Sequence, residues 1–324
     1  MNQKKILPVS EHFKLEKLSE GVFAAIASEN GAAFSNAGII DLGDITVIFD
    51  TFETPKAASD LKAAAESLTG RPAAFVINSH NHADHWFGNQ VFDGQTTIVA
   101  TNKTRDQMPV YIEELKSLKK KPSEMEDSLV KNQEMLEDET DPLRRAGLLR
   151  SIARLKYSLE AMPSLELKLP NQTFEGKLFL HGSQRSAELI GLERGHTSGD
   201  CLLALREEKV AFLGDLAFFQ RQPYLADCEP MMWKRMLDGI GQSSFETFVP
   251  GHGKIGTKKD ITLLSDYLTI LDDLVSQVIR SGGTVEDALK LTLPAPYDLW
   301  QQTSNHRFDD NVRFFFQYLT NTQP

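Results

Sequence analysis

The most chemically distinctive segment of the sequence is Asn78–His85, which reads Asn-Ser-His-Asn-His-Ala-Asp-His. Imidazole nitrogens and carboxylate oxygens are good ligands for Zn²⁺, and they also suit iron and manganese. Side chains alternate along an extended segment, so His80 and His82 are expected to point the same way. Asp84 and His85 are then directed elsewhere, and one short segment can serve two neighbouring metal positions.

Three more candidate ligands come after apolar, strand-like runs elsewhere in the chain, and each stands beside a glycine. They are His196 in Gly-His-Thr-Ser-Gly-Asp, Asp215 in Phe-Leu-Gly-Asp and His252 in Val-Pro-Gly-His-Gly. Glycine lets the backbone approach a metal closely and adopt positive φ. Each signal is weak alone, because a His or Asp at a strand end is often a turn residue. The predicted metal ligands are therefore His80, His82, Asp84, His85, His196, Asp215 and His252.

The segments that position these residues alternate between strand and helix patterns. Thr54-Pro55 predicts the start of a helix that ends at Gly70, because Thr is a good N-cap and Pro suits the first helical position. Strands are predicted at residues 22–27, 37–40, 45–50, 73–77, 174–181, 187–192, 201–205, 210–213 and 245–249. Further helices are predicted at about residues 229–240, 258–280 and 308–319.

The middle of the chain, about residues 101–163, has few β-branched residues and is rich in Glu, Lys and Leu. An apolar stripe at spacings of four and three predicts one helix face: Leu148, Ile152, Leu155, Leu159 and Met162. The segment Ser123–Glu139 also has a helical pattern, and Asp141-Pro142 separates it from the helix that carries the stripe. We therefore predict an inserted antiparallel helical hairpin that shapes substrate access or forms a homodimer contact. It contains no His and no Cys, so it supplies no nitrogen or sulfur ligand.

Composition narrows the possible partners. The 324 residues carry a formal net charge of −10, which disfavours nucleic acid and anionic membrane surfaces and leaves a small-molecule substrate as the expected partner. The two cysteines, Cys201 and Cys228, cannot form a disulfide framework. Residues 1–13 show no apolar signal-peptide core, so we expect a cytoplasmic protein.

The order of these motifs resembles the metallo-β-lactamase superfamily over about residues 20–255: an aspartate (Asp50), the His-x-His-x-Asp-His segment, then His196, Asp215 and His252. The resemblance implies an α/β fold of the αββα four-layer sandwich type, with the metals at one edge of the sheets. It implies a single domain over residues 1–324, with the helical insertion at about 101–163 and C-terminal helices at about 257–320.

The resemblance also implies how the ligands divide between two divalent ions, for which Zn²⁺ is expected and Fe or Mn is an alternative. The first ion would be held by His80, His82 and His196, and the second by Asp84, His85 and His252. Asp215 would bridge the two ions, and Asp50 would orient the ligand loop.

The function that this site implies is hydrolysis. Two cations about 3.5–4 Å apart can share a hydroxide, and a metal lowers the pKa of water towards 7. Such a hydroxide would cleave an ester, thioester, lactone or related bond, with Asp84 as the catalytic proton shuttle. Aromatic residues near the ligands, Trp86, Phe218 and Tyr224, are the expected substrate contacts.

The subfamily stays open at this stage. An aspartate at position 215, where true β-lactamases have cysteine, points to the broader hydrolases. The residues around His196 and Asp215 resemble glyoxalase II, but that family's Gly-Cys-Gly-Arg stretch is absent. The alternative function is that of a mononuclear non-haem iron oxidoreductase resembling the persulfide dioxygenases, in which two His and one Asp hold one iron. A non-catalytic binding protein is disfavoured, since buried unpaired ligands would be costly.

Overall fold

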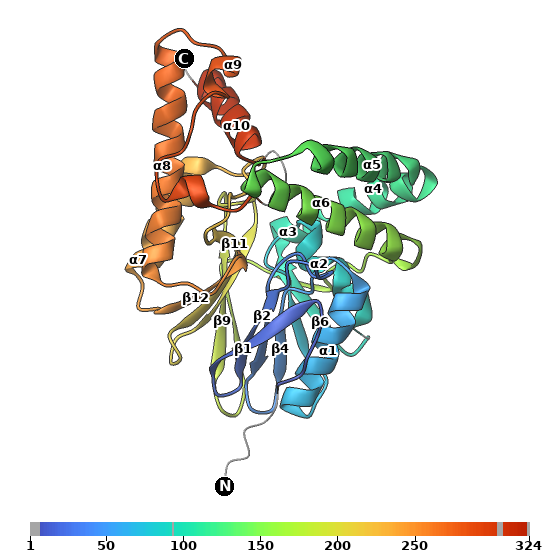
Figure 1. Ribbon diagram of the computed structural model, residues 1–324. Coiled ribbons are helices and arrows are strands. Elements are labelled where there is room, and N and C mark those ends of the chain that lie inside the picture. The colour runs from blue at the N-terminus through green and yellow to red at the C-terminus, as the bar shows by residue number, and fades with distance from the viewer. Residues whose placement is uncertain (1–6, 93, 303–306, 323–324) are drawn as a thin grey trace.

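A computed structural model describes residues 7–92, 94–302 and 307–322, and it contains two β-sheets stacked face to face with helices outside them (Figure 1). The first sheet keeps chain order: β1 (Phe13–Ser19), β2 (Val22–Ala27), β3 (Ala37–Asp41), β4 (Thr46–Phe49), β5 (Phe75–Ile77), β6 (Thr97–Thr101) and β7 (Gln172–Phe174). Strands β1 to β4 pair antiparallel, whereas β4 to β7 pair parallel.

The second sheet has the order β12-β11-β10-β9-β8. Its strands are β8 (Lys177–His181), β9 (Ser186–Leu192), β10 (Asp200–Leu205), β11 (Val210–Phe218) and β12 (Thr247–His252). The pairing of β11 with β12 is parallel and the other pairings in this sheet are antiparallel.

Three apolar cores separate four layers. Strand β4 shows why, because its side chains alternate between two of the cores: Ile48 packs with Leu61 of α1 (Pro55–Thr69), and Phe49 packs towards Phe212 of the other sheet. The third core lies between the second sheet and two helices, α7 (Pro230–Gln242) and α8 (Lys258–Arg280). This layering confirms the predicted αββα sandwich.

Helix α1 has the expected ends. The side chain of Thr54 accepts a hydrogen bond from the backbone N–H of Ala57, Pro55 occupies the first turn, and Gly70 ends the helix with φ +76°. These are local signals, and they are sufficient to fix where the helix begins and ends.

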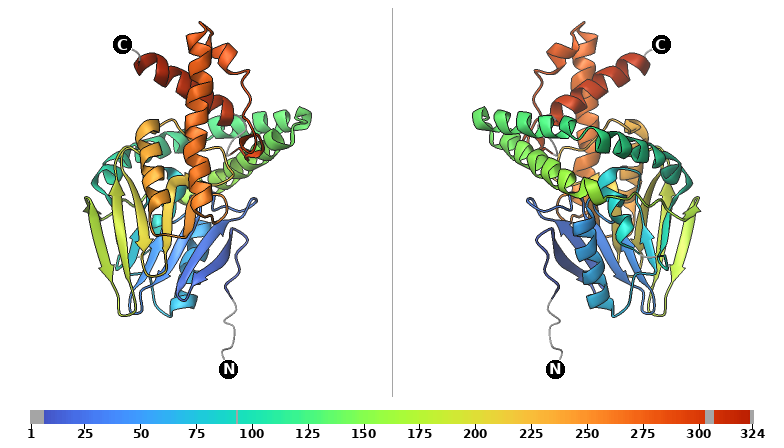
Figure 2. Two further views of the ribbon diagram at one scale, coloured as in Figure 1. Left: turned by 90° about the vertical axis from the view of Figure 1, so that its left-hand side faces the viewer. Right: turned by 90° about the vertical axis from the view of Figure 1, so that its right-hand side faces the viewer.

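The inserted segment is larger than the predicted hairpin. It contains α3 (Asn102–Gln107), α4 (Pro109–Lys120), α5 (Ser123–Asp138) and α6 (Pro142–Ala161), and then a short 3₁₀ helix, Met162–Ser164. The expected hairpin is the pair α5 and α6, and prolines begin or separate the successive helices. Figure 2 shows this group lying across the upper edge of the sandwich, beside the C-terminal helices.

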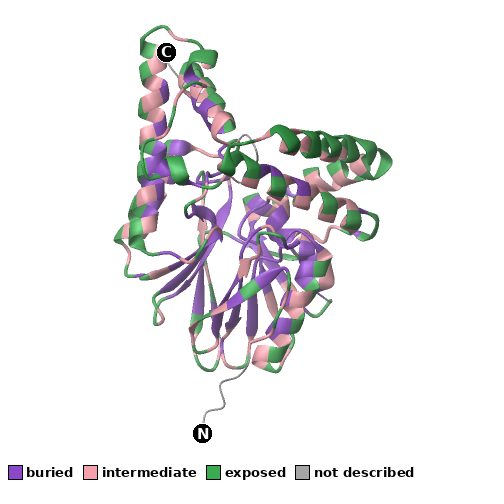
Figure 3. Cartoon of the chain, in the orientation of Figure 1, coloured by how far each residue is buried: buried purple, intermediate pink, exposed green. Residues whose placement is uncertain are grey.

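The apolar stripe of the insertion faces inward. Leu148, Ile152 and Met162 are buried within this one chain, and Leu155 and Leu159 are half-buried. Helix α5 contributes no buried residue and forms the exposed outer side of the group (Figure 3). Three of the five stripe residues are thus covered without a second subunit, and a homodimer through the insertion stays a prediction.

Some strand predictions were wrong. Residues 174–181 form two strands in different sheets, because the chain turns at Gly176 (φ +64°), with β7 pairing to β6 and β8 to β9. Strand β11 continues past the predicted end at Leu213, through Asp215, to Phe218. The sequence pattern also missed β1 and β6.

The remaining elements are short helices near the site and at the end of the chain. These are α2 (Ala83–Trp86), a 3₁₀ helix at Phe87–Val91, α9 (Val285–Ala288), a 3₁₀ helix at Tyr297–Leu299 and α10 (Arg307–Thr322). The predicted C-terminal helices thus correspond to α8, α9 and α10. Among the described residues, no helix has the length and apolar character that crossing a membrane requires. Residues 1–6, part of the stretch without a signal-peptide pattern, lie outside the described residues.

The core between the sheets gives a test of the sandwich. We expect Phe212→Ala to lower the free energy of unfolding by about 3–5 kcal/mol, because it leaves a cavity between the two sheets. The matched control is Phe179→Ala, whose ring is 50% exposed on β8 and whose loss should cost less than about 1 kcal/mol. Denaturant unfolding monitored by circular dichroism measures both. Equal losses would contradict this packing.

Candidate metal centre

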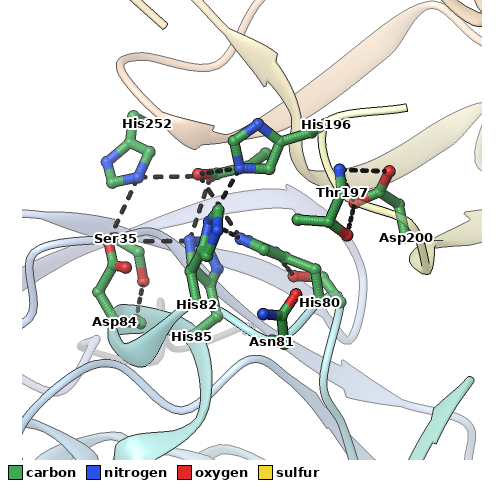
Figure 4. A network of polar contacts seen from close by, with 12 residues as sticks. Ser35, His80, Asn81, His82, Asp84, His85, His196, Thr197, Asp200 and His252 are labelled. Atoms are coloured by element: carbon green, nitrogen blue, oxygen red, sulfur yellow. Dashed lines mark hydrogen bonds and ion pairs between the residues drawn. The ribbon is translucent and has the colours of Figure 1, made fainter. Parts of the chain in front are cut away.

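All seven predicted ligands meet at one edge of the sandwich (Figure 4). His80 and His82 lie in the loop after β5, and Asp84 and His85 lie on the next element, the short helix α2. The other three come from the second-sheet half of the chain: His196 from the loop before β10, Asp215 from within β11 and His252 from the end of β12.

The first ligand group surrounds Nδ1 of His82. Nε2 of His80 and Nε2 of His196 each lie 3.0 Å from that atom. Oδ2 of Asp215 lies 3.8 Å from Nε2 of His80 and 3.4 Å from Nε2 of His196. A tetrahedral Zn²⁺ with bonds of about 2.0–2.1 Å holds its ligand atoms roughly 3.3 Å apart. The observed spacings fit that geometry.

The second group lies on the other side of Asp215. Its Oδ1 is 3.1 Å from Nε2 of His85 and 3.3 Å from Nε2 of His252. Oδ2 of Asp84 completes the group at 3.3 Å from Nε2 of His252 and 3.8 Å from Nε2 of His85. Asp215 therefore presents one carboxylate oxygen to each group, as a bridging ligand would.

Orphaned polar atoms show that the ligand set fits a metal. Nε2 of His85 and Oδ1 of Asp215 are buried and have no hydrogen-bond partner among the described residues, although they face each other. Leaving such groups unsatisfied costs free energy unless something binds them. Divalent cations are suited to nitrogen and oxygen donors arranged in this way.

Two of the histidines are held in the form that binds metals. Burial lowers the pKa of His80 well below its ordinary value, and His85 and His82 lower it further. Burial likewise lowers the pKa of His196 to about 3. Because an imidazole binds a metal in its neutral form, neither has to lose a proton near neutral pH.

The carboxylates are held in the charged form. Burial raises the pKa of Asp84, but His85, Arg154 and His252 outweigh it and bring that pKa well below its ordinary value. Burial likewise raises the pKa of Asp215, but the neighbouring His252 and His85 lower it by more, so this pKa also lies well below its ordinary value. Both carboxylates are thus anionic ligands over the physiological pH range.

Asp50, which the resemblance placed behind the ligand loop, contacts that loop directly. It is fully buried just after β4, and its Oδ2 lies 2.7 Å from Nδ1 of His85. Because a carboxylate accepts hydrogen bonds, Nδ1 of His85 must donate, which leaves Nε2 to face the site. Asp50 also accepts hydrogen bonds from the backbone N–H and the hydroxyl of Ser79, at 2.7 and 2.8 Å.

Asp227 has the corresponding role for His82, and sequence reasoning missed it. Its Oδ2 lies 2.8 Å from Nε2 of His82, the ring nitrogen opposite the one that faces the metal group. Asp227 belongs to the loop before α7, where no motif or strand end marks it. A carboxylate behind a ligand histidine fixes the orientation of the ring and raises its basicity.

Asp200 holds the loop that carries His196. Its carboxylate accepts hydrogen bonds from the backbone N–H of Thr197 at 3.0 Å and from the Thr197 hydroxyl at 2.7 Å. Burial raises the pKa of Asp200 to about 7, against the lowering effect of those bonds. The sequence signal for this loop is Asp200 itself, which stands four residues after His196 at the end of the glycine-flanked motif.

Two glycines allow the strands to approach the site, as expected. A Cβ at Gly251 would lie 1.9 Å from Oδ1 of Asp215. Gly214 has φ +53°, and a Cβ there would lie 2.6 Å from the side chain of Ser79. Any larger residue at either position would displace the bridging carboxylate or the ligand loop.

A cavity of about 840 Å³ opens onto the ligands His82, Asp84, Asp215 and His252. Two of the three predicted aromatic contacts line it. Phe218 stacks on His252, with ring centroids 5.1 Å apart, and Tyr224 meets His82 edge to face.

Trp86 does not line this cavity, so the prediction that it contacts substrate is wrong. The side chain is completely buried, and its indole N–H donates to the carbonyl of Asn81 at 2.7 Å. Its ring packs edge to face against Phe87 and Tyr111. Trp86 supports the ligand loop from behind.

Comparison with known proteins places this geometry in a family. A family model described as the metallo-β-lactamase superfamily matches residues 30–252. Since that match covers well over half of the chain and contains every predicted ligand, the chain belongs to the metallo-β-lactamase superfamily. A comparison with curated protein sequences gave no match.

Solved structures share the fold at low sequence identity. A metallo-β-lactamase from Pontibacter korlensis aligns with a TM-score of 0.56 at 15% identity, covering 79% of this chain and 99% of that one. One from Erythrobacter litoralis gives 0.56 and 15%, with 81% and 98% covered. A double mutant of the sec-alkyl sulfatase PisA1 gives 0.64 and 15%, with 96% of this chain and 51% of that chain covered.

The contact between Asp227 and His82 gives a test of the site. We expect Asp227→Ala to weaken metal binding by about 10–100-fold, because the ring of His82 loses its orienting acceptor. Competition titration against a chromogenic chelator measures the affinity. Asp273→Ala, an exposed position on α8, is the control and should bind metal as the wild type does. An unchanged affinity in Asp227→Ala would contradict the assigned role.

Proposed function

We propose that this chain is a binuclear metal-dependent hydrolase that cleaves an ester, thioester, lactone or related bond in a small molecule, with Zn²⁺ as its metal. The observation that carries the proposal is the position of Asp215. One of its carboxylate oxygens faces His80 and His196, and the other faces His85 and His252. A single metal would leave one of these oxygens and one ligand group unused.

When bound, a metal pair supplies an activated water molecule and an electrophilic contact for the bond to be cleaved. The residues of the chain then have separate tasks. The ligand histidines fix the geometry, and Asp50 and Asp227 keep two of their rings oriented. The cavity admits a substrate beside the ligands and, with Phe218 against His252, makes one wall of the site apolar.

Asp84 is the residue best placed to move a proton. Its Oδ2 faces His85 and His252, whereas its Oδ1 lies 3.7 Å from Nη2 of Arg154. The side chain lines the cavity, so one carboxylate reaches both the metal group and the substrate space. Its lowered pKa keeps it ionised before the reaction, and its position between the ligand group and the cavity is what supports a role in passing a proton from water to the leaving group.

The second ligand group supports the hydrolase over the oxidoreductase alternative. A mononuclear iron oxidoreductase needs two histidines and one carboxylate, which the first group supplies alone. The second group would then bind no metal, although the ligand atoms of Asp84, His85 and His252 lie close enough together to hold one ion. Because one solved structure of this fold is a sec-alkyl sulfatase, sulfate esters belong on the substrate panel.

Metal content tests the binuclear proposal directly. Fully loaded protein is expected to contain two metal ions per chain by elemental analysis, and to hydrolyse a member of a panel of chromogenic esters, lactones, thioesters and sulfate esters without oxygen. His252→Ala should retain one ion, because it removes a ligand of the second group alone. One iron per wild-type chain together with oxygen uptake would establish the oxidoreductase instead.

The role of Asp84 gives a second test. We expect Asp84→Asn to fold normally but to lose at least ~100-fold in kcat/KM on the best panel substrate, because the amide cannot accept the proton and is a weaker ligand. Metal content is measured on the same sample. Asp106→Asn, an exposed position on α3, serves as the control. Near-normal turnover of Asp84→Asn would refute the role.

A further inference from the structure

The cavity beside the metal ligands is lined by an excess of basic side chains. Apart from the ligands themselves, two carboxylates line it, Glu29 and Glu53. The basic residues that line it are Arg150, Arg154, Arg221, Lys254 and Arg307. With the ligand carboxylates Asp84 and Asp215 counted as well, five cations face four anions, so the side chains that line this cavity are net positive in a chain whose net charge is −10. A local field opposite to that of the whole protein concentrates anions at this place.

Two of the arginines share a single counterion. Arg150 on α6 and Arg221 in the loop after β11 both contact the carboxylate of Glu29, one at each oxygen. Both guanidinium groups are largely buried, with 15% and 14% of their side chains exposed. One carboxylate neutralises one of them, so a full positive charge remains in a poorly solvated place. A guanidinium has five N–H donors, and Glu29 together with the carbonyl of Gln302, which accepts from Nη1 of Arg150 at 2.6 Å, cannot occupy all ten.

A third arginine connects the insertion to the metal loop. Nε of Arg154, one turn after Arg150 on α6, lies 2.7 Å from Oε2 of Glu53. Its Nη2 is 3.7 Å from Oδ1 of the metal ligand Asp84. The hydroxyl of Ser158, a further turn along, donates to Oε1 of Glu53 at 2.8 Å. One face of α6 therefore brings two guanidinium groups to the cavity, and that of Arg154 lies beside a metal ligand.

Part of the remaining cavity wall is apolar. Phe34 and Leu155 line it and are half-buried, and Leu299 lines it with most of its side chain exposed. The guanidinium of Arg154 lies 5.9 Å from the ring centroid of Phe34, so the basic and apolar surfaces meet. A ligand that satisfies both surfaces has an apolar body and an anionic group.

We infer that Arg150, Arg154 and Arg221 form a subsite for the anionic group of an amphipathic substrate, a carboxylate, sulfate or phosphate attached to an apolar body. The planar guanidinium fork matches the paired oxygens of these groups. That the substrate is also cleaved rests on the hydrolase function proposed above, whereas binding of the anion does not. The helical insertion then has a chemical task, since it supplies two of the three arginines.

Binding of a probe that cannot be hydrolysed tests this subsite. Isothermal titration of metal-loaded protein compares octane-1-sulfonate, whose carbon–sulfur bond resists hydrolysis, with octan-1-ol. The sulfonate is expected to bind at least ~10-fold more tightly, since it alone can accept charge-assisted hydrogen bonds from the guanidinium groups. Equal affinities for the two probes would overturn the inference. Octyl phosphonate and nonanoate then rank the anionic groups.

Variants test whether the arginines account for the affinity for the sulfonate. Arg150→Gln and Arg221→Gln should each weaken sulfonate binding by about 10-fold and leave octanol binding unchanged. Arg144→Gln, at an exposed position outside the cavity on the same helix as Arg150, is the matched control. If the sulfonate affinity of the two cavity variants equals that of the control, the anion binds elsewhere, for example at the metals, and the inference is wrong.

A variant that is expected to bind the sulfonate more tightly distinguishes an effect on the subsite from misfolding. Glu29→Gln removes the carboxylate that competes for Arg150 and Arg221, so the sulfonate should bind several-fold more tightly, and a weaker affinity would contradict the subsite. The readout needs no turnover, so it separates the two proposals. Failure to bind the anion by a protein that hydrolyses neutral esters defeats the subsite alone. Anion binding without any hydrolysis defeats the hydrolase alone.

Discussion

The structure depends on one electrostatic constraint: two buried carboxylates and five histidines must converge within a few ångströms at the edge of a sandwich. Removing charges from water is costly unless they are paired or coordinated. The chain meets this cost partly with its own residues. Asp50 binds Ser79 and His85, and Asp227 binds His82, so these two rings are held before any metal arrives. Nε2 of His85 and Oδ1 of Asp215 remain unsatisfied and face the site.

The backbone obeys the same constraint. Side chains on separate strands can meet only if the strands come unusually close, and at this edge they do so at Gly214 and Gly251. The four layers behind the site keep these strands in register through three packed cores. Strands β11 and β12 and the short segments that directly follow or precede strands carry the ligands, and the more exposed helices α5 and α6 stand over the opening, where variation costs the core little.

Sequence reasoning predicted the structure correctly where it is determined by residues that are close together in the chain. Thr54 and Gly70 fix the ends of α1 through their own capping bonds and φ angles, and the His-rich segment comes directly after a buried strand. Sequence reasoning failed where the structure is determined by a contact between residues that are far apart in the chain. Nothing near Gly176 indicates that the strands before and after it join different sheets. Asp227 approaches His82 across 145 positions of sequence, and no pattern in one chain encodes that meeting. The prediction that Trp86 contacts substrate was wrong for a related reason. A core aromatic residue and a substrate-binding one have the same sequence pattern, and only burial distinguishes them.

The division of the ligands between the two halves of the chain has a thermodynamic consequence. Each group takes side chains from both: His80 and His82 stand with His196, and Asp84 and His85 stand with His252. A bound ion in either group therefore cross-links the two sheets. The unfolded chain cannot offer these groupings, so the free energy of metal binding adds to that of folding. If both groups bind an ion as proposed, separating the sheets means releasing both, which would make the loaded sandwich more cooperative and couple its lifetime in the cell to the supply of metal.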